Sequence, residues 1–143
     1  DLGAPLRAVQ NFDSYDCRGR NRIVGAKISE HGKGNALDIR SIRLANGAAV
    51  EPTNPHVARE FREKLRQSVC ARFTTVLGPG SDGYHEDHVH VDLAERRGGY
   101  RLCQWDVRDP EPPAADVAAT GSVPLPPPRP KFEDAAPPLR GKL

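Results

Sequence analysis

The segment GYHEDHVHVD, residues 83–92, holds three of the chain's five histidines and three of its carboxylates. Neutral imidazole is a preferred zinc ligand, and it also exchanges protons near neutral pH. Successive side chains of a strand point to opposite faces, so His88, His90 and Asp92 share one face. An H-x-H pair also occurs on solvated strands without a metal. A metal site therefore requires a second ligand motif elsewhere in the chain.

The segment SEHGKGNALD, residues 29–38, supplies such a motif. His31 is followed by Gly32 and Gly34, which adopt backbone conformations that other residues resist. The loop can therefore fold back and bring His31 toward Asp38. These two residues and one histidine of the H-x-H pair make three protein ligands. A fourth position remains for water, which is typical of catalytic zinc.

The hydrophobic pattern predicts the elements that must position these motifs. Residues 36–44 alternate apolar and polar side chains, which indicates a strand, and Asn46-Gly47 is a hairpin signal. Apolar residues recur every fourth position from Val57 to Val69, which indicates a helix, and Asn54-Pro55 predicts its start. Further strands are expected over residues 6–12, 48–50, 73–77, 88–93 and 100–105. The expectation is an α+β domain with a small antiparallel sheet flanked by helices.

Composition divides the chain into residues 1–108, the domain, and residues 109–143. The second segment holds ten of the fourteen prolines and is expected to be a disordered Pro-rich tail. Its motif PLPPPRP, residues 124–130, fits a spacer or a ligand for a polyproline-binding partner. The domain carries a net charge of about +3, too little for nucleic-acid binding. No apolar run is long enough for a membrane span.

The three cysteines, Cys17, Cys70 and Cys103, are too far apart for a CxxC zinc site. In a reducing cytosol all three would be buried thiols. In an oxidising compartment we expect a Cys70–Cys103 disulfide, because Cys70 lies near a helix end and Cys103 in the last strand. Cys17 would then pair with a residue upstream. The chain starts at Asp1 and lacks methionine, so we expect a processed product or a fragment, truncated at its N-terminus.

Several segments resemble known families. SEHGKGNALD and HEDHVH resemble the S-x-H-x-x-G-x-A-x-D and H-x-H motifs of the LAS zinc peptidases, which include D-alanyl-D-alanine carboxypeptidases, murein endopeptidases and hedgehog. Together with SYDCRGRN, TVLGPGSDGYHEDHVHVDLAERR and YRLCQW, they resemble more closely the bacterial extensin-like C-terminal domain, over residues 3–106. The resemblance implies a fold like that of hedgehog and the D-Ala-D-Ala peptidases.

The resemblance also implies roles for single residues. The zinc ligands would be His31, Asp38 and His90, and His88 would stabilise the transition state. The general base would be Asp87, by its spacing from the last ligand, or His85, by the murein endopeptidase pattern. Both alternatives stay open, because strand alternation places Asp87 on the face opposite His88. Arg18, with Arg20 as the second candidate, would hold a substrate carboxylate.

These roles predict a zinc-dependent amidase that cleaves peptidoglycan peptides, as a D,D-endopeptidase or carboxypeptidase, in the bacterial periplasm or cell envelope. One alternative is a catalytically silent, zinc-stabilised module that binds the cell wall or a partner. Another is a metal-dependent phosphoesterase, which is disfavoured because two-metal sites need more bridging carboxylates. The bond that is cut stays open.

Overall fold

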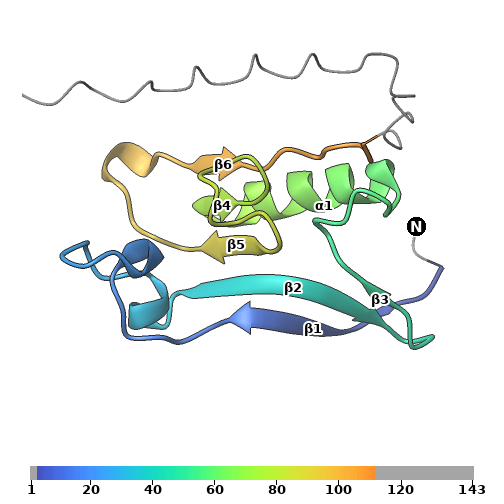
Figure 1. The fold of residues 1–143 in the computed structure, drawn as a ribbon, viewed down its shortest axis with the longest axis horizontal. Coiled ribbons are helices and arrows are strands. Elements are labelled where there is room, and N and C mark those ends of the chain that lie inside the picture. The colour runs from blue at the N-terminus through green and yellow to red at the C-terminus, as the bar shows by residue number, and fades with distance from the viewer. Residues whose placement is uncertain (1–2, 112–143) are drawn as a thin grey trace, which may run out of the picture. The chain divides into compact units, whose positions relative to one another are not determined.

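The computed structural model describes residues 3–111, which form a small α+β fold (Figure 1). The strands are β1 (Leu6–Asp13), β2 (Ala36–Leu44), β3 (Ala49–Val50), β4 (Thr75–Leu77), β5 (Val89–Asp92) and β6 (Leu102–Gln104). The helices are α1 (Arg59–Arg72) and three single 3-10 turns at Arg20–Arg22, His31–Lys33 and Arg97–Gly99. Within the described part of the chain no helix is long and apolar enough to cross a membrane.

The six strands form one sheet in the order β1-β2-β5-β4-β6, with β3 paired to β2. All neighbours are antiparallel except β4 and β6, which are parallel. The expected all-antiparallel sheet is therefore wrong at one edge, and the sheet is mixed. The chain reverses direction before β5 and again before β6, so β6 runs in the direction of β4. The expected flanking helices reduce to the single α-helix α1 in residues 3–111.

Helix α1 begins at Arg59, later than the Asn54-Pro55 pair predicted. The Asn54 side chain accepts a hydrogen bond from the His56 N–H at 2.9 Å and closes a local turn instead of capping a helix. The buried Arg62 guanidinium binds the carbonyl oxygens of Pro55 (3.1 Å) and Val57 (2.8 Å). Those carbonyls are thereby satisfied outside a helix, and the first turn starts after them.

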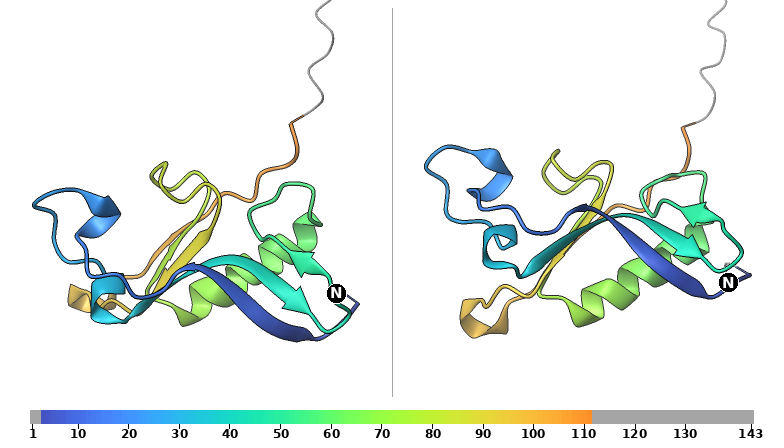
Figure 2. Two further views of the ribbon diagram at one scale, coloured as in Figure 1. Left: turned by 60° about the horizontal axis from the view of Figure 1, so that its bottom comes forward. Right: turned by 90° about the horizontal axis from the view of Figure 1, so that it is seen from below.

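The two faces of the sheet have different roles. Val89 and Val91 of β5 pack with Val76 of β4 and Val69 of α1 in the hydrophobic core. Because side chains alternate along β5, His90 lies on the face away from α1. Figure 2 shows α1 against one face of the sheet, while two loops stand away from the other face. We call residues 14–28 the arginine loop and residues 78–87 the histidine loop.

The predicted disulfide between Cys70 and Cys103 is confirmed, with a Cα–Cα distance of 5.7 Å. It joins the end of α1 to β6. Cys17 is exposed and is not in a disulfide with any described residue. Of the expected Pro-rich tail, residues 112–143 lie outside the described part.

Candidate metal centre

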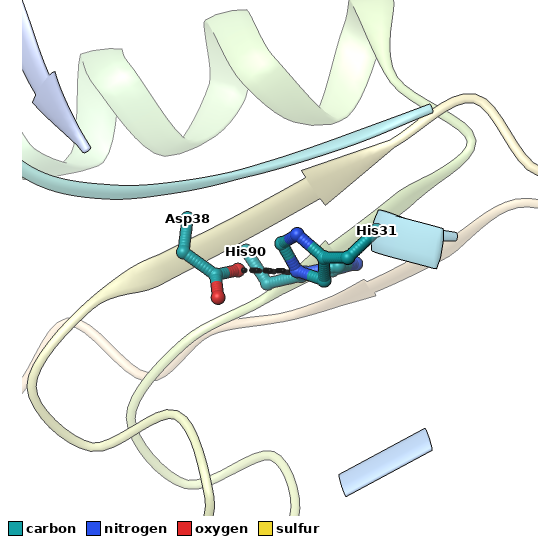
Figure 3. Close-up of side chains that lie close together, drawn as sticks. All are labelled: His31, Asp38 and His90. Carbon is teal, nitrogen blue, oxygen red and sulfur yellow. Dashed lines mark hydrogen bonds and ion pairs between the residues drawn. The ribbon is translucent and has the colours of Figure 1, made fainter. Parts of the chain in front are cut away.

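The register between β2 and β5 brings two of the predicted ligands together. Asp38 and His90 are cross-strand partners, and His90 Nδ1 lies 2.8 Å from Asp38 Oδ1. His31 enters from the 3-10 turn before β2, which ends at Gly34 with φ of 67°, a left-handed conformation that favours glycine. The turn places His31 Nε2 3.2 Å from Asp38 Oδ1. Figure 3 shows the three side chains pointing toward one another.

The spacing of these atoms fits a small tetrahedral ion. Besides the two distances given, His31 Nε2 and His90 Nδ1 are 3.2 Å apart. Ligands about 2.0–2.1 Å from a tetrahedral zinc ion lie about 3.3 Å from one another. The cluster of His31, Asp38 and His90 could therefore hold a metal ion with little rearrangement. Two nitrogens and one oxygen suit zinc better than calcium or magnesium, which prefer oxygen ligands.

In His31 and in His90, the ring nitrogen that points away from the cluster lies beside a hydrogen-bond acceptor. The Nδ1 of His31 lies 2.8 Å from the backbone carbonyl of Ser14, which can only accept a hydrogen bond. The Nε2 of His90 lies 3.2 Å from Asp92 Oδ2, a carboxylate oxygen. A neutral ring at either position would therefore carry its proton on the nitrogen beside that acceptor and turn its lone pair toward Asp38. Three acceptor atoms facing one another require a cation, either a metal ion or a proton.

The electrostatics of the cluster agree with this requirement. Burial acts to raise the pKa of Asp38, but the hydrogen bond and charge of His90 outweigh it and lower the pKa below 3.8. Burial acts to lower the pKa of His90, but Asp38 and Asp92 raise it to about 9. Burial also opposes the ionisation of Asp92, yet its hydrogen bonds from His90 and neighbouring groups lower its pKa to about 2. Without a metal, a proton on His90 thus takes the cation's place.

His85 and His88 stand beside the cluster. The His85 ring centroid lies 5.5 Å from that of His90 and 5.1 Å from that of His88. His85 Nδ1 is 2.7 Å from Asp82 Oδ1, which leaves Nε2 as its second proton site. Burial lowers the pKa of His85 below 6.5, against the opposing effect of Asp82. Burial thus favours the neutral form of His85, and the contact with Asp82 fixes the orientation of its ring.

His88 is held between carboxylates. Its Nδ1 lies 2.8 Å from Asp87 Oδ1, and its Nε2 lies 3.5 Å from Asp38 Oδ2. The ring also stacks on Phe12 of β1, with centroids 4.8 Å apart. The Asp87 side chain itself is 68% exposed and contacts His88 from the outside.

The last strand supports the histidine loop. The Gly78 N–H donates to the carbonyl of Gln104 at 2.9 Å, and the Asp106 N–H donates to that of Pro79 at 2.8 Å. A Cβ on Gly78 would lie 2.7 Å from Cγ of the buried Trp105, so only glycine fits there. The start of the histidine loop is thus held by hydrogen bonds and packing against β6 and the residues that follow it.

A cavity of about 360 Å³ lies over the cluster, between the two loops. His31, Asp38, His85, His88 and His90 all line it, whereas Asp87 does not. The arginine loop contributes Arg18, Arg20, Asn21 and Arg22 to its wall.

The arginines of that wall differ in their partners. Arg18 is bound to Asp13 (2.9 Å) and Asp16 (3.0 Å), and its side chain is mostly buried. Arg20 is exposed and forms no ion pair with another residue in the described range 3–111. The charge of Arg20 is therefore available to a ligand in the cavity.

Of the site residues predicted from the sequence, all except Asp87 line this cavity, and Asp87 contacts His88 from outside the cavity wall. Sequence reasoning missed the partners of the histidines, namely Asp82, Asp92 and the Ser14 carbonyl. Asp92 could have been found, since it follows His90 by two positions on one strand face. Asp82 precedes His85 by three residues in a turn, and the Ser14 carbonyl leaves no signal in the sequence.

Comparison with known proteins places the chain in a family. Neither the curated proteins nor the solved structures searched give a match. The family model described as Extensin-like protein C-terminus matches residues 1–104, which include both ligand motifs and the histidine and arginine loops. The chain therefore belongs to the extensin-like protein C-terminus family.

Proposed function

We propose that this protein is a zinc-dependent amidase that hydrolyses peptide bonds in peptidoglycan. The observation that carries the proposal is the cluster of His31, Asp38 and His90, which borders a cavity beside a histidine–carboxylate pair. The resemblance of both ligand motifs to the LAS zinc peptidases supports the same reaction. The disulfide fits the oxidising environment of a cell envelope.

His31, Asp38 and His90 would hold the zinc ion. Zinc in such a site polarises a carbonyl and lowers the pKa of a bound water toward neutrality. All three residues line the cavity, so a zinc ion held by them would be accessible to water and substrate. The remaining steps of amide hydrolysis belong to the other side chains that line the cavity.

His85 is the proposed general base. It lines the cavity, it is buried, and its Nδ1 is held by Asp82, so Nε2 is left to accept a proton from water. The same atom can then deliver the proton to the leaving amine. Asp87, the other candidate, is exposed and lies outside the cavity wall, so its proposed role is to orient His88.

His88 is proposed to stabilise the oxyanion. Its Nε2 lies 3.5 Å from Asp38 Oδ2, so an N–H on that nitrogen would point toward the cluster. Stacking on Phe12 restricts its rotation. A fixed N–H donor beside the reacting carbonyl is the arrangement that lowers the barrier of acyl transfer.

Arg20 is proposed to bind a carboxylate of the substrate. Arg18 was the first candidate from the sequence, but its guanidinium is paired with Asp13 and Asp16. Its proposed role is therefore to hold the arginine loop in shape. Carboxylate recognition suits peptidoglycan stem peptides, which carry free carboxylates.

The test combines zinc content with cleavage of purified muropeptides. Wild type, His31→Ala and the control His56→Ala, an exposed histidine far from both motifs, are analysed for metal and incubated with the peptides. We expect one zinc per chain in wild type and control, zinc loss in His31→Ala, and water addition across one amide that a chelator abolishes. Mass spectrometry of the products identifies the bond. Zinc without cleavage over a broad peptide panel would contradict the amidase and favour the zinc-stabilised binding module.

A further inference from the structure

Asp92 stands behind the metal cluster and has no role in the proposed chemistry. It is buried, with 4% of its surface exposed. One oxygen, Oδ2, lies 3.2 Å from His90 Nε2, and the other, Oδ1, accepts the N–H of Ala94 at 2.9 Å. Thr74 Oγ1 adds a longer contact to Oδ1 at 3.5 Å. The carboxylate is therefore fixed at both oxygens, and one of them is aimed at a ligand ring.

The two nitrogens of His90 face different partners. Nδ1 faces the cluster, at 2.8 Å from Asp38 Oδ1 and 3.2 Å from His31 Nε2. Nε2 faces away from the cluster, toward Asp92. Only a ring with its proton on Nε2 presents a lone pair to the cluster. An acceptor at Nε2 favours that tautomer, and a donor there would favour the opposite one.

We propose that Asp92 is a positioning residue that makes His90 a ligand through Nδ1, by accepting the proton of Nε2. The inference rests on the metal-binding part of the proposed function and not on catalysis. Histidine ligands commonly donate their other N–H to a carboxylate, and loss of such a partner weakens metal binding 10–100-fold. The competing explanation is that Asp92 serves only to satisfy the buried Ala94 N–H.

Asp92→Asn separates these explanations. The amide has nearly the shape of the carboxylate, and its oxygen can still accept the Ala94 N–H. Its NH₂ group then points at His90 Nε2 and acts as a donor. The ring is thereby driven to carry its proton on Nδ1, where it blocks the cluster. If Asp92 only accepts the Ala94 N–H, the substitution by Asn should leave zinc affinity unchanged.

The experiment measures zinc affinity at one fixed pH by competition with a chromophoric chelator. The proteins are wild type, Asp92→Asn and the control Asp106→Asn, which removes an exposed carboxylate outside the cluster. We expect a 10–100-fold weaker affinity for Asp92→Asn and no more than a twofold change for the control. A cooperative unfolding transition of metal-free Asp92→Asn, compared with that of metal-free wild type, shows that the variant is folded. An unchanged affinity in folded Asp92→Asn would overturn the proposal.

A second measurement needs no variant. Long-range ¹H–¹⁵N NMR spectra of the zinc-loaded wild type report which nitrogen of His90 carries the proton. We expect the proton on Nε2. A proton on Nδ1 would overturn the role of Asp92 even if cleavage is found. Zinc binding with the expected tautomer but no hydrolysis would leave this inference standing and remove the amidase.

Discussion

Asp38 on β2 and His90 on β5 face each other across adjacent antiparallel strands, with Oδ1 and Nδ1 2.8 Å apart. The cross-strand pairing fixes two members of the candidate metal cluster on adjacent strands. The third member, His31, comes from a short turn. The geometry of the cluster therefore depends on the register between β2 and β5 as well as on the conformation of that turn.

His85→Ala is expected to lower kcat by roughly 10²–10⁴-fold, because it removes the proposed base. Zinc content should stay at one per chain, since His85 is not a ligand. Asp87→Asn should retain activity within about tenfold, because Asp87 is exposed and acts only through His88. Steady-state kinetics on the identified muropeptide measure both. A large loss in Asp87→Asn with little loss in His85→Ala would reverse the assignment of the base.

The pH dependence of kcat should reflect the ionisation of His85. The base acts when neutral, and burial lowers its pKa below 6.5, so kcat should fall only as the pH drops below that value. Asp82 raises the pKa of His85, and Asp82→Asn should therefore move the acidic limb to lower pH and reduce the plateau. The measurement is kcat of wild type and Asp82→Asn between about pH 4.5 and 8, on either side of the ordinary histidine pKa of about 6.5. An acidic limb that moves upward in Asp82→Asn would contradict the pairing.

The metal-free protein should lose stability at alkaline pH. The pKa of His90 is raised from 6.5 to about 9, so the folded state binds a proton that the unfolded state releases. This contribution is complete below pH 6.5 and disappears as the pH rises through about 9. The difference corresponds to about 3 kcal/mol as an upper limit. Urea unfolding in a chelator, from pH 6 to about 9.5, measures it, and zinc-loaded protein should not follow the same decline because zinc replaces that proton.

Substitutions of Arg20 and Arg18 should have different effects, one on substrate binding and the other on the free energy of unfolding. Arg20→Ala is expected to raise KM for a substrate with a free carboxylate and to leave KM for its carboxamide analogue unchanged. Arg18→Ala should lower the free energy of unfolding by about 1–3 kcal/mol, because Asp13 and Asp16 lose the more buried of their two arginine partners and keep only the exposed Arg22. Equal effects of Arg20→Ala on both substrates would exclude the proposed contact.

Removing the disulfide should cost stability. A closed loop of this length is worth about 3–4 kcal/mol in the chain-entropy model. The double variant Cys70→Ser/Cys103→Ser should therefore unfold at a lower temperature than wild type. Cys17→Ser is the matched control, because Cys17 is exposed and outside the bridge. Calorimetry of the three proteins distinguishes the bridge from the loss of a thiol.

The sequence predicts the strands and the proximity of His31, Asp38 and His90, because period-two alternation and motif spacing are local signals. The sequence does not predict features that depend on contacts between residues outside the local pattern. The start of α1 depends on Arg62 binding carbonyls of the preceding turn, and the direction of β6 depends on two chain reversals. The choice between Asp87 and His85 also lies beyond local patterns, since it depends on which of the two side chains lines the cavity in the folded protein.

The bridge between Cys70 and Cys103 has a consequence for proteolysis. Residues 70–103, including His85, His88 and His90, form a covalent ring closed by the two sulfurs. A single cut in the exposed part of the histidine loop opens the ring without releasing either piece. The nicked protein would keep its mass on a non-reducing gel and separate into fragments only after reduction.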